Sequence, residues 1–126
     1  MNAPDAVRSD VNAHNHAMEV PIAQVVQELV DLLGATVVAN IGNVQETRAV
    51  QEWLTDRRPQ RPHVLRFALQ LATMIAGVSD REMVTAWFHG CNPALDDRIP
   101  MYMLRDGELD EVQGPLLSAA RSFAAR

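Results

Sequence analysis

The chain contains no lysine, a single cysteine and few aromatic residues. All eleven of its basic side chains are arginines, and its 126 residues include two Trp, one Tyr and three Phe. With only Cys91 available, an internal disulfide is excluded, and a reducing compartment is expected. Aliphatic and methionine side chains must therefore form most of the core.

Long hydrophobic runs are also missing. No apolar stretch approaches the length of a membrane span, and the N-terminal residues lack the basic-then-apolar pattern of a secretory signal. We therefore expect a cytoplasmic protein that does not contact membranes. Apolar residues make up 48% of the chain, which favours a globular fold, and 126 residues are enough for one domain with a modest core.

Charge is unevenly distributed along the chain. The net charge of −5 argues against nucleic-acid affinity of the whole molecule. Between Glu46 and Arg66 there are five arginines and three acidic residues, whereas between Asp80 and Glu111 there are eight acidic residues and three arginines. One region is thus mildly basic and the other acidic. Guanidinium groups suit bidentate contacts with phosphate or carboxylate, although a GC-rich genome would produce the same composition.

Patterns typical of catalysis or metal binding do not occur. His14, His16, His63, His89 and Cys91 lack the spacing of a zinc site. His89 and Cys91 are only two residues apart, and no oxyanion-forming element accompanies them. A Gly-rich phosphate loop is missing as well. We expect no enzymatic activity, no cofactor and no metal.

Apolar residues recur at helical spacing through most of the chain, and no segment alternates with period two. One helix is predicted to end at Gly34. The most apolar segment begins at Pro62 and ends at Gly77, and we predict that it is the central core helix. A further short helix is predicted from Pro100 to Gly107. The expected fold class is all-α, a compact multi-helix domain.

Local signals suggest further helix boundaries. Asn43 with Glu46 and Ser79 with Glu82 have the spacing of capping pairs, so each pair predicts the start of a helix. The final amphipathic stretch is expected to be interrupted at Gly114-Pro115, because proline disturbs a helix interior.

Three regions follow from this pattern. Residues 1–18 lack apolar periodicity and are predicted to form a mobile tail. Residues 19–76 form a helical, helix-turn-helix-like half. Residues 77–126 form a second helical half with most of the acidic side chains.

Two short helices joined at Gly42-Asn43 are similar to a degenerate helix-turn-helix. The second helix would place polar side chains in the major groove of double-stranded DNA, and arginines after it would contact phosphates. The candidate DNA-binding residues are Thr47, Arg48, Gln51, Arg57, Arg58 and Arg61. Glu46 and Glu52 favour the alternative of an ordinary helical hairpin with a charged outer face.

The segment with Trp87, Asn92-Pro93-Ala94-Leu95, Pro100 and Asp106-Gly107 resembles the C-terminal toxin-binding domain of the Xre/MbcA/ParS family of antitoxins. The resemblance covers roughly residues 37–123. It implies an all-α antitoxin that holds a partner toxin inactive and represses its own promoter as a homodimer or higher oligomer. The usual partner in this family is a RES-domain toxin that degrades NAD.

The resemblance also implies where the partner binds. Contacts are expected in the loop from Asn92 to Ile99 and in the final helix, whose end would cover the catalytic cleft of the toxin. The candidate partner-binding residues are Trp87, Asn92, Leu95, Asp96, Asp97, Arg98, Arg121, Ser122 and Arg126. The acidic side chains expected to complement a basic rim on the toxin are Asp96, Asp97, Asp106, Glu108, Asp110 and Glu111.

Two other functions stay open at this point. The chain fits a stand-alone helix-turn-helix transcriptional regulator, for example of prophage origin, that has no toxin to restrain. It also fits a protein-interaction module whose helix-turn-helix no longer binds DNA. The acidic C-terminal region favours the antitoxin, whereas the degenerate turn and its two glutamates favour the interaction module.

Overall fold

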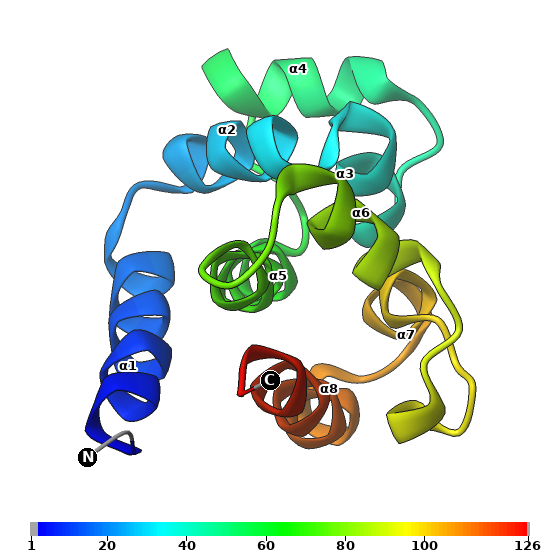
Figure 1. Ribbon diagram of the computed structural model, residues 1–126. Helices are drawn as coiled ribbons and strands as arrows, with labels where there is room; N and C mark the ends of the chain where they lie inside the picture. The colour runs from blue at the N-terminus through cyan, green and yellow to red at the C-terminus, as the bar shows by residue number, and fades with distance from the viewer. Residues whose placement is uncertain (1–2, 126) are drawn as a thin grey trace.

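The computed structural model describes residues 3–125, which form eight α-helices and one short 3-10 helix (Figure 1). Within these residues the only β-type pairing is an isolated bridge, so the predicted all-α class is confirmed. None of the described helices combines the length and the apolar character needed to cross a bilayer. The helices are α1 (Ala3–Glu19), α2 (Ile22–Leu33), α3 (Ala35–Ile41), α4 (Thr47–Thr55), α5 (Pro62–Ala76), α6 (Arg81–His89), the 3-10 helix η1 (Pro93–Leu95), α7 (Pro100–Asp106) and α8 (Leu109–Ala124).

Helix α5 lies at the centre of the fold. Helices α1, α2, α6 and α8 all pack against it, and Figure 1 shows it end-on with the other helices around it. Ten of its 15 residues are buried, among them Phe67, Leu71 and Ile75, and Pro62 occupies its first turn. The sequence prediction of a central core helix is therefore confirmed. A helix with apolar residues around most of its circumference must be covered on several sides, and this requirement places its neighbours.

Helix α1 occupies most of the region predicted to be a mobile tail, so that prediction is wrong for the described residues. Ala13 and Ala17 are buried, and α1 packs along α5. The two alanines are four residues apart and share one side of the helix, where their small side chains allow close approach. His14 Nδ1 also lies 3.2 Å from Oε1 of Gln70, a buried polar residue of α5. Alanines produce little hydrophobic periodicity, which explains the error.

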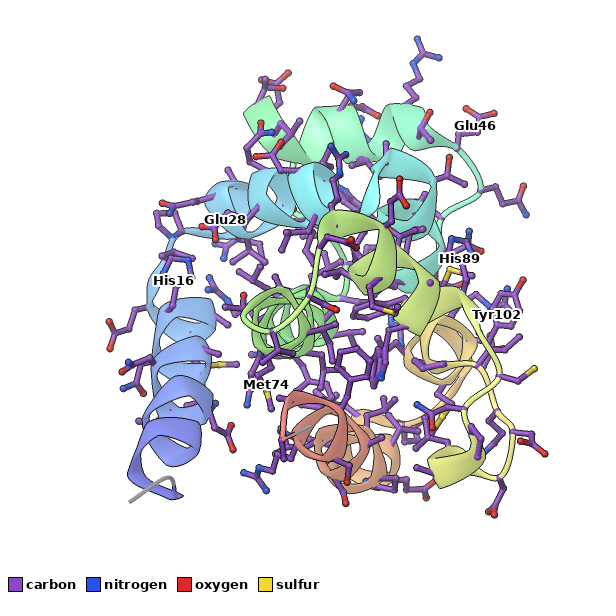
Figure 2. The ribbon with its side chains drawn as sticks, viewed as in Figure 1. His16, Glu28, Glu46, Met74, His89 and Tyr102 are labelled. Atoms are coloured by element: carbon purple, nitrogen blue, oxygen red, sulfur yellow. The ribbon has the colours of Figure 1, made fainter. Side chains whose placement is uncertain are left out.

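Polar contacts hold the C-terminal end of α1 in place. His16 Nε2 lies 2.8 Å from a carboxylate oxygen of Glu28 on α2 (Figure 2). The Arg66 guanidinium on α5 donates to the backbone oxygens of Ala17 at 2.9 Å and of Val20 at 2.6 Å. These carbonyls are at or just beyond the end of α1, where they have no partner within the helix. Arg66 therefore caps α1 from a neighbouring helix.

Helices α2, α3 and α4 pack against one another in the helix-turn-helix-like half. Helix α2 ends before Gly34, which has a φ of 85°, as the sequence predicted. The predicted capping pair of Asn43 and Glu46 does not form. Asn43 adopts a left-handed φ of 59° in the turn after α3, and Glu46 precedes α4 without a side-chain cap. Asparagine tolerates the left-handed region well, so it shapes the turn instead of capping the helix.

Two other predicted boundaries also differ from the structure. The residue that caps α6 is Asp80, not Ser79, and its carboxylate accepts a 2.9 Å hydrogen bond from the Met83 backbone N–H. Helix α8 runs without interruption through Gly114-Pro115. Gly114 has no Cβ to collide with the proline ring, and this side of α8 is exposed to solvent. Both properties lower the cost of proline within the helix.

Gly42 packs directly against the ring of Trp53. A methyl group at Gly42 would lie 2.5 Å from Trp53 Cη2, so Gly42→Ala is expected to lower the free energy of unfolding by about 1–3 kcal/mol through overpacking. Gly77→Ala is the control, because Gly77 has a similar backbone conformation and its nearest contact is 3.4 Å. The control should change stability by less than about 1 kcal/mol. Urea unfolding measures both variants, and equal midpoints would contradict the predicted clash.

Candidate partner-binding site and nucleic-acid interface

Helix α4 exposes the three side chains predicted to contact DNA bases. Thr47, Arg48 and Gln51 are exposed, whereas Val50 and Trp53 face the core. The three exposed residues share one side of α4 because a helical turn takes about 3.6 residues. The structure thus gathers these candidate residues on one surface.

Acidic and basic side chains surround this surface. Glu46 is exposed where α4 begins, and Glu52 is partly exposed, with a carboxylate oxygen 3.6 Å from Arg57 Nε. The side chain of Arg57 is 75% exposed, so this ion pair contributes little free energy. Arg58 is exposed as well. Arg57 and Arg58 are therefore accessible at the end of α4.

Arg61 has a different role from these two arginines. Its Nη1 donates a 3.0 Å hydrogen bond to the Ile41 carbonyl, and its Nη2 donates a 2.9 Å hydrogen bond to the Leu104 carbonyl. One guanidinium thus joins the end of α3 to α7, using the fork geometry of its donors. Two of the five N–H donors of Arg61 are thus engaged within the chain, and its contact with DNA phosphates stays a prediction.

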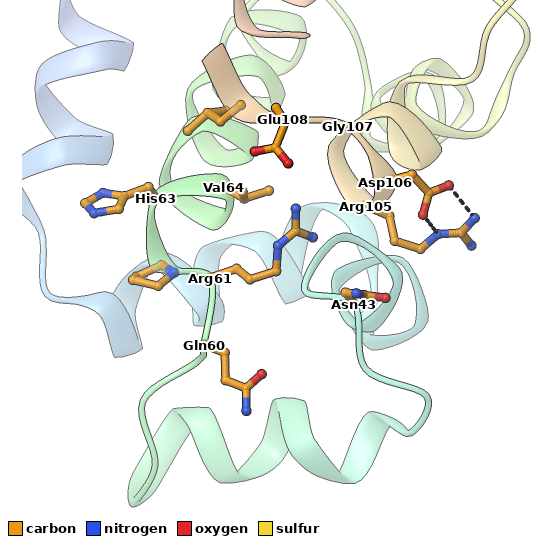
Figure 3. Close-up of a pocket in the computed structure, with 11 residues that line it drawn as sticks. Asn43, Gln60, Arg61, His63, Val64, Arg105, Asp106, Gly107 and Glu108 are labelled. Carbon is orange, nitrogen blue, oxygen red and sulfur yellow. Dashed lines mark hydrogen bonds and ion pairs between the residues drawn. The ribbon is translucent and has the colours of Figure 1, made fainter. Parts of the chain in front are cut away.

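A hollow of about 480 Å³ lies beside Arg61 (Figure 3). His63 and Glu108 line it, as do Arg105 and Asp106. Arg105 donates two hydrogen bonds of 2.7 Å to Asp106. These bonds lower the pKa of the Asp106 carboxyl and raise the pKa of Arg105. The guanidinium groups of Arg61 and Arg105, which both line this hollow, therefore already form hydrogen bonds within the chain.

The loop 92–98 is closed by its own hydrogen bonds. The Asn92 side chain accepts from the Ala94 N–H at 3.0 Å, and the Asn92 N–H donates to the Arg98 carbonyl at 3.0 Å. Leu95, in the middle of the loop, is only 1% exposed and belongs to the core. The prediction that Leu95 contacts a partner is therefore wrong, because its side chain anchors the loop.

Asp96 and Asp97 occupy the tip of this loop and are exposed. Both have left-handed backbone angles, with φ of 57° and 63°. Such conformations cost on the order of 1–3 kcal/mol each, although aspartate tolerates them better than most residues. The Nε of Arg98 donates to the Leu95 carbonyl at 2.9 Å, which reinforces the turn. The loop therefore presents its two carboxylates from a closed, internally bonded turn.

A second hollow, of about 210 Å³, lies between the end of α6, this loop and the C-terminal part of α8. Trp87, Asn92 and Ser122 line it, and all three are candidate partner-binding residues. The Trp87 ring is largely buried and makes an edge-to-face contact with Phe88 at 5.1 Å between ring centres. Residues far apart in the sequence thus meet at one open hollow.

The remaining candidates are at the C-terminal end. Arg121 forms an ion pair with Asp10 of α1, so its guanidinium is engaged within the chain, while Ser122 is exposed. Arg126 lies outside the described residues. The acidic side chains of Glu108, Asp110 and Glu111 are exposed where α8 begins.

Sequence reasoning missed the small residues that complete the second hollow. They are Ala86 and Gly90 on or next to α6, and Ala119 on α8. Alanine and glycine carry no functional group that a sequence pattern identifies. Their contribution arises only because α6, the loop and α8 meet in the fold.

Comparison with known proteins finds no match: no family model, no curated protein and no solved structure matches this chain. The resemblance to Xre/MbcA/ParS antitoxins rests on the quoted residues alone and stays a prediction.

The two hydrogen bonds from Arg61 to backbone carbonyls are expected to stabilise the fold. Arg61→Met keeps the apolar stem but leaves the Ile41 and Leu104 carbonyls without their donor. Because hydrogen bonds from charged groups contribute about 1.5–3 kcal/mol each, we expect the free energy of unfolding to fall by about 3 kcal/mol. Arg58→Met, at an exposed position, should stay within about 0.5 kcal/mol of the wild type. Indistinguishable urea midpoints for the two variants would show that these hydrogen bonds add no stability.

Proposed function

We propose that this protein is an antitoxin-like binding protein that neutralises a partner toxin by direct contact and has no catalytic activity of its own. One observation carries the proposal: Trp87, Asn92 and Ser122 line a single hollow, and the loop beside it carries Asp96 and Asp97. These are residues that the family resemblance selects as partner-binding. The same resemblance suggests a RES-type, NAD-degrading toxin as the partner.

The exposed acidic side chains support a basic partner surface. Asp96 and Asp97 lie at the loop tip, and Glu108, Asp110 and Glu111 are exposed where α8 begins. Complementary charges raise the association rate and set the orientation of two proteins more than they raise affinity. The free energy of binding must therefore come mainly from the apolar contact at the hollow.

The last turns of α8 form the second part of the proposed interface. Ser122 lines the hollow, and Arg121 is paired with Asp10. The Arg121 side chain is 57% exposed, whereas that of Asp10 is only 16% exposed. Exchanging Asp10 for an acidic group on the toxin would leave the Asp10 carboxylate without its partner, so contacts with the toxin must offset that cost. Arg121 stays among the proposed contacts because the family resemblance selects it.

We propose in addition that the protein, as a dimer, binds double-stranded DNA through α4 and represses its own promoter. The supporting observation is that Thr47, Arg48 and Gln51 are exposed on one side of α4, with Arg57 and Arg58 just beyond. A recognition helix reads base edges with such side chains, while arginines fix it on phosphates. A dimer is expected because one short helix contacts too few base pairs for useful specificity.

The toxin proposal is tested by growth and by binding. Expression of the toxin encoded next to this gene should stop growth, and co-expression of this chain should restore it. Asp96→Asn combined with Asp97→Asn is expected to weaken toxin binding about ten-fold, mainly through slower association. The control, Asp31→Asn with Asp56→Asn, removes the same charge from exposed positions on α2 and just after α4.

Equal effects of the two double variants would mean that only the overall charge matters. If no neighbouring gene product stops growth, the stand-alone transcriptional regulator replaces the antitoxin as the preferred function.

If the protein binds DNA, its affinity for DNA should fall steeply as the salt concentration rises. Removing one arginine that neutralises a phosphate should reduce the slope of log affinity against log salt by about 0.9, so Arg57→Ala should flatten it by that amount. Arg48→Ala should instead change the preferred base sequence. Fluorescence anisotropy with promoter DNA measures both, with Arg81→Ala on α6 as the exposed control. A salt response that is already flat for the wild type would contradict DNA binding.

A further inference from the structure

Small side chains and two aromatic residues, Trp87 and Phe123, line the hollow between α6, the loop 92–98 and α8. Ala86 and Gly90 line it from the α6 side, Ala94 from the loop and Ala119 from α8, with Trp87 beside them. Its volume of about 210 Å³ lies below the roughly 300–1,000 Å³ of small-molecule sites. Ala86, Gly90 and Ala94 are exposed, so the hollow is accessible from solvent. It has room for one apolar side chain of another molecule.

The carboxylates next to this hollow are not neutralised. Asp96 and Asp97 follow Ala94 closely in the loop, and neither carboxylate accepts a hydrogen bond or forms an ion pair in the part of the chain that the structure describes. Of the nearby arginines, Arg98 donates its Nε–H to the backbone of its own loop, and Arg121 is paired with α1. The loop that forms one side of the hollow thus carries two negative charges that have no partner within the described chain.

We infer that this hollow receives one apolar side chain, such as Leu, Met or Phe, from a basic segment of the partner protein, with arginine or lysine on either side of it. The small residues and Trp87 match the apolar side chain, and Asp96 and Asp97 match the flanking cations. The inference deepens the proposed function and rests on it in one respect, namely that the partner is a protein. A single anchor in a desolvated pocket typically supplies much of the binding free energy of an interface.

The apolar side chain of the partner segment and the basic residues on either side of it have separate roles in recognition. Burial of the apolar side chain supplies free energy through the area removed from water, about 25 cal/mol per Å². The loop charges steer the basic segment into place and suppress acidic competitors. A segment that lacks either feature should therefore bind much more weakly.

Peptide titration of the full-length ¹⁵N-labelled protein tests the site without any toxin. The probe is Gly-Ser-Arg-Leu-Arg-Ser-Gly, with one matched peptide that has Ser in place of Leu and another that has Glu in place of both Arg. We expect the amide signals of Gly90, Cys91 and Ser122 to shift with the probe and to shift at least about five-fold less with either matched peptide. Absence of these shifts, or equal shifts with the glutamate peptide, would overturn the inference.

Matched variants on α8 locate the binding site. Ser122→Phe fills the hollow, whereas Ser118→Phe places the same ring one turn earlier, at an exposed position that does not line it. The first should abolish the peptide-induced shifts, and the second should keep them within about two-fold of the wild type. Ala94→Met fills the hollow from the loop and should act like Ser122→Phe. Circular dichroism verifies that all three variants are folded, and binding that persists in both filled variants would overturn the inference.

The growth assay separates this inference from the proposed function. Probe binding at the hollow without toxin neutralisation would keep the inference and remove the antitoxin function. Neutralisation that Ser122→Phe and Ala94→Met leave unchanged would keep the function and remove the inference.

Discussion

Helix α5 has ten buried residues among 15, and helices α1, α2, α6 and α8 cover it because its apolar side chains extend around most of its circumference. Each fully buried Leu, Ile or Phe contributes about 1.5–3 kcal/mol, so these side chains together contribute more than any single polar contact in this fold. The positions of the surrounding helices, and therefore of both candidate surfaces, depend on this packing. One of the few aromatic residues, Trp53 of α4, packs against Gly42 at the end of α3.

Arginine, the only strongly basic residue type in the chain, has two kinds of role. Arg61 and Arg66 direct their guanidinium groups at backbone carbonyls and so connect segments that are distant in the sequence. Arg48, Arg57 and Arg58 are exposed around α4. The first pair stabilises the fold by satisfying carbonyls at or near helix ends, while the second set is available to a ligand. Of the arginines between residues 46 and 66, therefore, only some are exposed on the surface, and the others form hydrogen bonds inside the fold.

The two candidate surfaces lie on opposite sides of α5. Figure 1 shows α4 on one side and the loop with α8 on the other. A partner at the hollow near Ser122 and DNA at α4 would therefore not compete for the same residues. Arg61 links α3 to α7. Helix α3 packs against α4, which carries the proposed DNA-binding residues, and α7 packs against α8, which lines the hollow. The proposed functions can thus coexist in one chain.

The amino-acid sequence by itself determined the all-α class, the central helix from Pro62 and several helix ends, because periodicity, proline placement and terminal glycines act within a few residues. Only the tertiary structure decided that Ala13 and Ala17 pack on α5, that Arg61 bonds to two carbonyls and that Leu95 is an anchor. It also decided that small residues from α6, the loop and α8 enclose a hollow. These outcomes depend on which helices meet, and packing between segments distant in the chain leaves no local signal in the sequence.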